Sequence, residues 1–434
     1  MRFLTLFLSL FFLNQAFSQS EITFSSFDAL KQFVFKNSPV LKRENSNLEL
    51  ASLTQKAAVG NVLNPRAPVS GTLTNNTQLP VNFIPAEIFG GPAGTFREVQ
   101  FGQQFISVLN ISPQFDIINP SKIGDVKSAK INKELAEMDN KLFIQNFESQ
   151  LSFLYYNITG LQEQSDVVSE QLIASEGILD IVHQKYVQGL LSIVELNDAE
   201  LNVEDLKRTS KTIQLNIESQ LAFLKSTAGI EENIVINDHV EVDEFISGVN
   251  VEVNSIYLKK FILNEAFVKQ SFKSSKLQNL PTLSFFSSFN WQNNSNSNYF
   301  DSNQRWINSN FYGLKLTYDI PSTVGKLTNM GTLRIQRDQA ELMSQISKVQ
   351  AESDRQTLNN DYLKALADYQ VAEKSVRLLD ESYQVQLDRF NQEILPLEKL
   401  LEMQRKLLVA KTSLASSMAT LQYQLEKIRI NNLN

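Results

Sequence analysis

Two stretches of the chain carry the alternating three- and four-residue spacing of apolar positions that is typical of a coiled-coil seam. From Ile144 to Tyr186 the spacing runs without interruption, and eleven of the thirteen positions on it are apolar. The same register returns 204 residues later, from Leu358 to Phe390. Such a seam predicts long helices that pack against each other along their whole length.

Each seam resumes after a short break, at Leu196 and at Leu400. We therefore expect two helical hairpins, over residues 121–227 and 327–430. A further helix is expected before each hairpin, at 39–64 and 251–279, and the first of these begins at Pro39, a residue favoured in a first helical turn. The chain thus predicts two tandem repeats that share a pattern and little identity.

Period-two alternation of apolar and polar residues marks four segments between these helices. Strands are expected at about 66–82, 97–118, 281–292 and 306–320. The connector at 79–98 is rich in proline and glycine, and the one at 292–304 is rich in asparagine. Four strands cannot close a barrel, and an open sheet leaves two edges exposed. Either helices of the same chain cover this sheet, or several copies complete a membrane barrel; we favour the barrel.

Composition narrows the function classes. Residues 1–18 have an early cation, an apolar core and small residues near the end, which predicts a cleavable secretory signal. The absence of cysteine excludes disulfides and thiol chemistry, and a net charge of −7 argues against nucleic acid as a partner. His183 and His239 have no companions at metal-ligand spacing, and we find no catalytic or phosphate-binding motif. We therefore expect no enzyme activity, no metal and no cofactor.

Several segments resemble the TolC-type outer-membrane efflux proteins, and together they cover nearly the whole mature chain. They are the opening at residues 27–71, the turn "KYVQGLLSIVELNDAELN" and the strand exits "FDIINPS" and "YDIPSTVGK". The resemblance implies a mostly helical fold with a β-barrel contribution: long antiparallel coiled-coil helices and four transmembrane strands per chain. Three copies would form a twelve-stranded barrel on a periplasmic helical tunnel.

The resemblance also implies the organisation and the role of the chain. Residues 19–230 form the first repeat, 231–250 an equatorial segment, and 251–434 the second repeat. The protein would be the outer-membrane exit duct of a tripartite efflux or type I secretion system. Its partners would be a periplasmic adaptor protein, through it an inner-membrane transporter, and outer-membrane lipid.

Two groups of site residues follow from matching the family pattern. The turns at the hairpin tips would dock the adaptor; their residues are Gly189, Leu190, Leu191, Ser192, Glu393, Ile394, Leu395 and Pro396. The second turn has Glu393 where glycine is usual. Four charged residues just beyond the turns would narrow the pore: Glu195, Asp198, Lys399 and Glu402. Lys399 stands where an acid is commoner, so it could pair with Glu402 or Glu195.

Each group has a simpler interpretation, in which the tip leucines pack inside the hairpin and the charges are solvated helix residues. An exported coiled-coil scaffold or adhesion protein is the alternative for the whole chain. It explains the seams but not the paired strands. The cargo cannot be read from the sequence, because pump and adaptor select it.

Overall fold

The computed structural model describes residues 21–238, 250–319 and 324–433, so the expected signal segment and His239 lie outside the described residues. The chain forms two compact units, each built from separate pieces of the sequence. The helical unit comprises Met1–Ser46, Asp139–Leu258 and Ser347–Asn434, and the strand unit comprises Asn47–Met138 and Lys259–Ile346. Each unit therefore takes residues from both halves of the chain.

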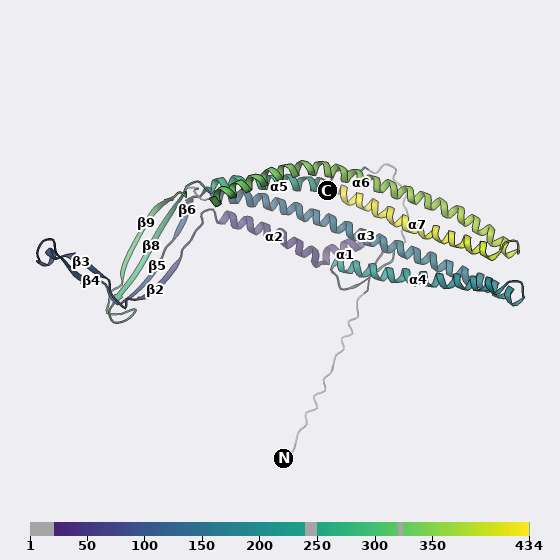
Figure 1. The fold of residues 1–434 in the computed structure, drawn as a ribbon, viewed down its shortest axis with the longest axis horizontal. Helices are drawn as coiled ribbons and strands as arrows, with labels where there is room; N and C mark the ends of the chain where they lie inside the picture. The colour runs from purple at the N-terminus through teal and green to yellow at the C-terminus, as the bar shows by residue number, and fades with distance from the viewer. Residues whose placement is uncertain (1–20, 239–249, 320–323, 434) are drawn as a thin grey trace, which may run out of the picture. The chain divides into compact units, whose positions relative to one another are not determined.

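Long helices make up most of the chain (Figure 1). In chain order they are α1 (Phe27–Asn37), α2 (Pro39–Gly60), α3 (Pro120–Val187), α4 (Ile193–Ala228), α5 (Ser255–Leu277), α6 (Val324–Asn391) and α7 (Leu397–Asn432). The four helices α2, α3, α5 and α6 each contribute residues to both units. No helix among the described residues is both long enough and apolar enough to cross a membrane.

The seam positions form the core of the helical unit. Leu151, Ile158 and Val182 of α3 are fully buried, as are Leu400 and Leu421 of α7. One apolar cluster contains Ile178 and Leu196 of the first hairpin together with Tyr383 and Leu400 of the second, so the two hairpins share a core. A short parallel pair, β1 (Glu21–Phe24) with β7 (Asn233–Ile236), joins another cluster around α1 and α3.

The main sheet of the strand unit is antiparallel. Its strands are β2 (Val69–Asn75), β5 (Phe105–Ile111), β6 (Gln114–Ile118), β8 (Thr282–Ser295) and β9 (Ile307–Thr317). β8 is central: β9 pairs with one of its edges, and β5 and β6 pair one after the other with the opposite edge. β2 pairs only with β5 among the described residues, so β2 and β9 are the outer strands.

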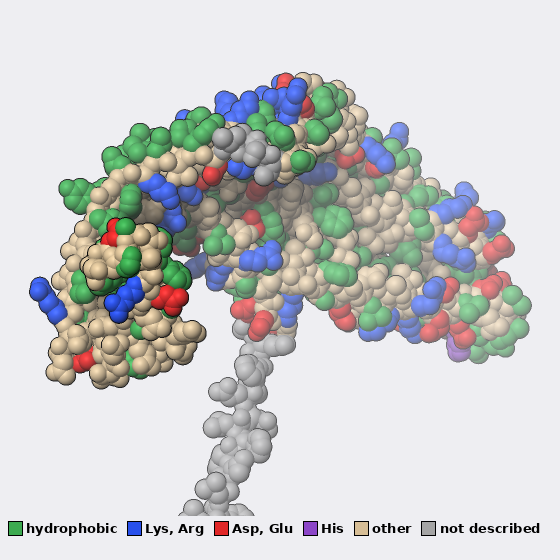
Figure 2. Space-filling view, turned by 60° about the vertical axis from the view of Figure 1, so that its left-hand side comes forward, with side chains coloured by type: hydrophobic (Ala, Val, Ile, Leu, Met, Phe, Trp, Pro, Cys, Tyr) green, Lys and Arg blue, Asp and Glu red, His purple; other side chains and the backbone are tan. Residues whose placement is uncertain are grey.

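The strand register places most of the large apolar residues of the sheet on the same face. Leu109 lies opposite Trp291, Phe115 opposite Phe285, and Leu314 opposite Phe285 on the other side. Much of this apolar face is exposed in the single chain, including Val69, Leu73, Leu109, Tyr312, Leu314 and Leu316. Figure 2, in which hydrophobic side chains are green, shows such side chains at the surface of this region. The sheet is therefore apolar where a water-soluble sheet would be polar.

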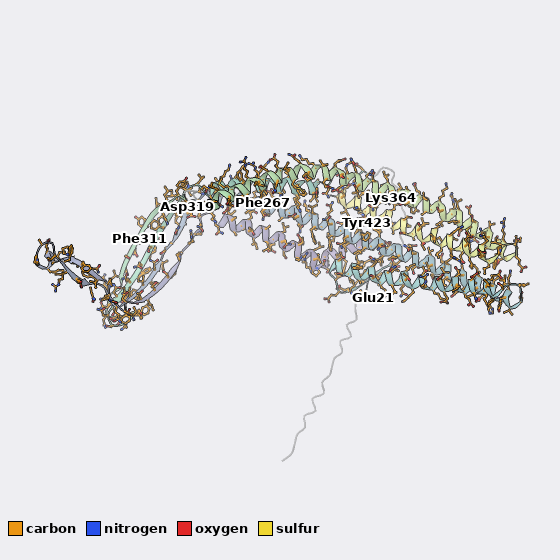
Figure 3. The ribbon with its side chains drawn as sticks, viewed as in Figure 1. Glu21, Phe267, Phe311, Asp319, Lys364 and Tyr423 are labelled. Atoms are coloured by element: carbon orange, nitrogen blue, oxygen red, sulfur yellow. The ribbon has the colours of Figure 1, made fainter. Side chains whose placement is uncertain are left out.

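The opposite face is largely polar and is hydrogen-bonded from strand to strand. The Asn110 amide donates to Ser288 Oγ at 2.8 Å, and Ser284 Oγ donates to the Asp116 carboxylate at 2.7 Å. Two aromatic rings also lie on this face. Phe311, labelled in Figure 3, meets Phe286 edge to face with ring centroids 6.1 Å apart. A polar inner face and an apolar outer face are what a barrel around a water-filled lumen requires.

The structure corrects the strand expected at 97–118, which is three strands. Gly102 adopts a φ of 124°, which interrupts the extended strand between β4 (Phe96–Gln100) and β5. A second break falls at Ser112 and Pro113, where proline has no N–H to give the ladder. β4 does not join the main sheet; it pairs with β3 (Val81–Pro85) in a separate hairpin that includes the short helix η1 (Ala86–Phe89). Much of the expected connector is therefore structured.

A close crossing of α3 and α7 gives a test of the packing. A methyl group added at Gly160 would lie 2.6 Å from the Cβ of Ala419, whereas one added at Gly177, also in α3, meets nothing within 4 Å. Gly160→Ala should lower the free energy of unfolding by about 1–3 kcal/mol through overpacking. Gly177→Ala should raise it by up to about 1 kcal/mol through helix propensity.

Thermal unfolding followed by far-ultraviolet circular dichroism measures both variants. The paired substitutions remove the same glycine flexibility from the same helix, so they differ in the space around the added methyl group. Equal shifts of Tm in the two variants would contradict the close crossing.

Candidate functional site

The two hairpin turns have the same backbone geometry although their sequences differ. In the first, the N–H of Gly189 donates to the Tyr186 carbonyl and that of Leu190 to the Lys185 carbonyl, both at 2.9 Å. In the second, the N–H of Glu393 donates to the Phe390 carbonyl at 3.0 Å and that of Ile394 to the Arg389 carbonyl at 2.9 Å. These are equivalent positions, 204 residues apart. The missing glycine has not changed the turn.

A left-handed residue closes each turn. Gly189 has a φ of 77° and Glu393 a φ of 62°. For a residue with a Cβ this conformation costs about 1–2 kcal/mol. The helices then restart differently. Ser192 caps α4 through a capping box with Glu195, whereas Pro396 precedes α7 and provides no side-chain cap.

The apolar tip residues divide into exposed and packed ones. Leu190 and Ile394, at equivalent positions, are 60% and 69% exposed. Leu191 and Leu395, the next pair, are half-buried against the apolar cluster shared by the two hairpins. Docking by Leu190 and Ile394 stays compatible with the structure, while Leu191 and Leu395 already pack inside the hairpins, as the simpler interpretation expects.

An ion pair joins the two turns. Lys185 Nζ lies 3.3 Å from Glu393 Oε1, and the same ammonium lies 5.2 Å from the centre of the Phe390 ring. Glu393 is thus both the left-handed residue of its turn and the partner of a lysine in the other hairpin. The two tips form one surface.

The four charged candidates beyond the turns have different surroundings. The Glu195 carboxylate accepts the Ser192 N–H at 2.7 Å and so caps a helix, while Asp198 is exposed. Lys399 lies 3.0 Å from Glu402, and Lys406 lies 2.8 Å from the same carboxylate. Hydrogen bonds from Lys406 and Lys399 lower the pKa of Glu402 to about 2. Of the two partners expected for Lys399, the structure shows Glu402.

Sequence reasoning missed a polar contact buried beneath the tips. Gln404 is 2% exposed; its amide donates to Ser175 Oγ at 2.6 Å and its carbonyl oxygen accepts from Asn202 at 3.2 Å. The three residues belong to α7, α3 and α4. The only signal was Ser175, one of the two polar residues on the first seam.

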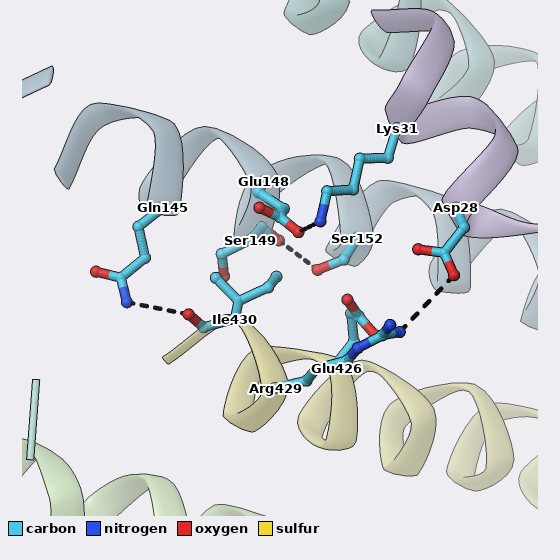
Figure 4. Close-up of polar contacts among 9 residues, drawn as sticks. All are labelled: Asp28, Lys31, Gln145, Glu148, Ser149, Ser152, Glu426, Arg429 and Ile430. Atoms are coloured by element: carbon cyan, nitrogen blue, oxygen red, sulfur yellow. Dashed lines mark hydrogen bonds and ion pairs between the residues drawn. The ribbon is translucent and has the colours of Figure 1, made fainter. Parts of the chain in front are cut away.

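A second missed cluster ties the end of α7 to α1 and α3 (Figure 4). Lys31 of α1 pairs with Glu148 of α3, and Arg429 of α7 lies 3.5 Å from Glu426 and 3.8 Å from Asp28. Burial raises the pKa of the Glu426 carboxyl. In sequence these residues are scattered helix charges, so nothing marked them as a cluster.

The comparisons with known proteins agree with this geometry. No family model matches the sequence, and no curated protein matches it. Solved structures do. The outer membrane protein VceC of Vibrio cholerae has 15% identity and a TM-score of 0.68, over 93% of this chain and 95% of that one. The Campylobacter jejuni CmeC outer membrane channel has 14% identity and a TM-score of 0.71, over 93% and 85%.

A third structure, the open state of the Neisseria gonorrhoeae MtrE outer membrane channel, has 13% identity and a TM-score of 0.65, over 93% of this chain and 88% of that one. The resemblance expected from the sequence is therefore confirmed at the level of the fold. This chain has the fold of the TolC-type outer-membrane channels.

The equivalent turns allow a matched test of the left-handed position. Gly189→Ala should destabilise the first turn by about 1–2 kcal/mol, since the added methyl meets no atom within 4 Å and only backbone strain remains. In Glu393→Ala the strain is already present in the parent protein, and the variant loses only the ion pair between the exposed Glu393 and the half-buried Lys185, about 0–1 kcal/mol. Amide hydrogen exchange read by mass spectrometry reports the opening of each turn.

Exchange should accelerate by about tenfold at the first tip in Gly189→Ala. The change at the second tip in Glu393→Ala should be smaller. The reverse order would show that the ion pair with Lys185, not the backbone, holds the second turn.

Proposed function

We propose that this protein is a passive channel through the outer membrane, built from three copies that pool their strands into one closed barrel. The sheet carries this proposal, since its apolar face is exposed in the single chain and its polar side chains are hydrogen-bonded to one another between strands. An apolar outer band around a polar interior is the arrangement found in membrane-spanning barrels. The solved structures with a similar fold include proteins called outer membrane channels.

Strand direction supports closure by several copies. Three antiparallel pairings lead from β2 through β5 and β8 to β9, so β2 and β9 run in opposite directions. β9 of one copy can therefore pair antiparallel with β2 of the next, and the ring leaves no edge. If β5 and β6 count as one interrupted strand, each copy brings four strands and three copies bring twelve. The helical hairpins would extend from the barrel as a periplasmic tunnel.

The tips would then be the end that receives cargo. Leu190 and Ile394 place apolar side chains beside the ion pair of Lys185 with Glu393, so a periplasmic adaptor hairpin could cover both turns at once. Through the adaptor the channel would connect to an inner-membrane transporter. Glu195, Asp198, Lys399 and Glu402 would line the narrow part of the pore. Their formal charges sum to −2 per copy, which favours cations.

The coiled-coil scaffold is the weaker alternative. It accounts for the seams and the shared core of the hairpins. It gives no reason for a sheet whose exposed face carries Leu314, Leu316 and Tyr312, because that face would aggregate in water.

Conductance tests the channel directly. The purified protein should conduct in planar bilayers, and its reversal potential in a KCl gradient should show a preference for cations. Lys399→Ala should increase that preference, and Glu402→Gln should decrease it, because Glu402 stays ionised at any working pH above its low pKa. Lys348→Ala, an exposed lysine of α6 far along the chain from the turn, serves as the control.

A protein that never conducts would overturn the channel. A channel whose selectivity is the same in all three variants would keep the function and remove Lys399 and Glu402 from the constriction.

Docking at the tips can be tested separately with matched substitutions. Leu190→Asp and Ile394→Asp should reduce copurification of the adaptor severalfold, because each replaces an exposed apolar contact by a charge. Gln188→Asp and Gln392→Asp add the same charge two residues earlier in the same turns without removing an apolar group. Trimer yield is checked in all four variants. Equal loss in the glutamine controls would assign the effect to charge alone and contradict apolar docking.

A further inference from the structure

The hairpin of β3, η1 and β4 is a well-formed structure whose large apolar side chains are mostly exposed. The chain between β2 and β5 could have turned in a few residues, yet it spans residues 76–104. Five of its large apolar residues are strongly exposed in the single chain: Phe83, Ile88, Phe89, Phe96 and Phe101. A two-stranded hairpin is marginal in water by itself, so this one needs a surface to rest on.

Specific contacts hold the end of the hairpin in one conformation. The Glu87 carboxylate accepts the Gly94 N–H at 3.0 Å, and Thr95 Oγ1 donates to the Pro92 carbonyl at 2.7 Å. The Arg97 guanidinium lies 5.6 Å from the centre of the Phe89 ring. Gly91 packs so closely on Ala86 that an added Cβ would lie 2.9 Å from the Ala86 Cβ. Such a segment presents its aromatic side chains in fixed positions.

The hairpin follows β2, which is an outer strand of the sheet. In Figure 1 it lies beyond the end of the sheet at which β2 stops and β9 starts. The segment before β9 lies at that same end and carries two exposed aromatic side chains, Phe300 and Trp306, with ring centroids 6.4 Å apart. When β9 of one copy pairs with β2 of the next, the aromatic residues of the hairpin and the Phe300–Trp306 segment come together at the boundary between the two copies, which we call the subunit seam.

Charge agrees with this pairing. Glu98 lies directly opposite Phe83 in the hairpin, on the same face. On the other side of the subunit seam, Arg305 precedes Trp306, and both Glu98 and Arg305 are exposed. Each surface therefore offers an aromatic ring with a charge beside it, and the charges have opposite signs.

We propose that the β3–β4 hairpin of each copy packs on the Phe300–Trp306 segment of the neighbouring copy and fastens the subunit seam between them at the outer end of the barrel. This rests on the proposed trimer. The hairpin buries Phe83 and Phe96 in the assembly, and Glu98 faces Arg305 of the next copy. The apolar surface that is exposed in one chain is thus an interface between copies.

Thiol cross-linking can test this cleanly because the chain has no cysteine of its own. Two differently tagged forms are coexpressed, one with Phe83→Cys and the other with Phe300→Cys, and intact outer membranes are treated with a short bis-maleimide. A covalent product carrying both tags can form only between copies. Asn82→Cys replaces Phe83→Cys as the control, because Asn82 is adjacent in β3 and points to the opposite face.

The expected result is a two-tag product severalfold more abundant with Phe83→Cys than with Asn82→Cys. The double variant Phe83→Ser, Phe96→Ser should also lower the temperature at which the trimer dissociates in detergent, relative to Asn82→Ser. A trimer with equal or absent linkage in both cysteine pairs overturns this inference and leaves the channel proposal standing. If the unmodified protein forms no trimer, both proposals fail.

A membrane-bound hairpin gives a distinct result. A fluorophore attached at Phe83→Cys would be quenched by spin-labelled lipid in reconstituted vesicles, with no two-tag product in the outer membrane. That outcome would assign the aromatic face to lipid and overturn the contact between copies.

Discussion

The open edges of the sheet are the constraint on which the rest of the structure depends. β2 and β9 each present a row of backbone N–H and C=O groups that no described strand of the same chain pairs. In water such an edge invites uncontrolled pairing, and in lipid its unpaired groups cost several kcal/mol each. An apolar face that is exposed on the same sheet adds to the cost of leaving this edge in water. The proposed pairing of copies edge to edge would give these backbone groups their partners.

The open sheet edges also bear on what the helical unit has to do. A barrel made from several copies needs each copy to hold its strands at a fixed angle and spacing. The helices α2, α3, α5 and α6 contribute residues to both units. Within the helical unit, close contacts such as Gly160 on Ala419 and buried polar contacts such as Gln404 with Ser175 fix the helices in one register. Buried polar contacts of this kind specify an arrangement more than they stabilise it.

Much of this fold could be read from the sequence, for reasons that the structure makes clear. The 3, 4 spacing survives because its apolar residues are the core, and the period-two strands survive because each has two unlike faces. The breaks in the long strand could not be read in this way. Gly102 and Pro113 act on the backbone without disturbing the apolar alternation, so the pattern continued through them. Long-range clusters such as Lys31 with Glu148 leave no local signal at all.

The tips show how one backbone turn can be reached by two sequences, and what the difference adds. Glycine at position 189 makes its turn without strain and has no side chain to offer. Glutamate at position 393 accepts the strain of a left-handed residue and in exchange reaches Lys185 in the other hairpin. An ion pair in which Glu393 is exposed and Lys185 is half-buried stabilises by about 0–1 kcal/mol, less than the strain of about 1–2 kcal/mol, so stability alone does not explain the exchange. The ion pair connects the two turns directly, in addition to the apolar cluster that the two hairpins share. The glutamate therefore makes the two tips a single surface, which is the property that a shared docking partner requires.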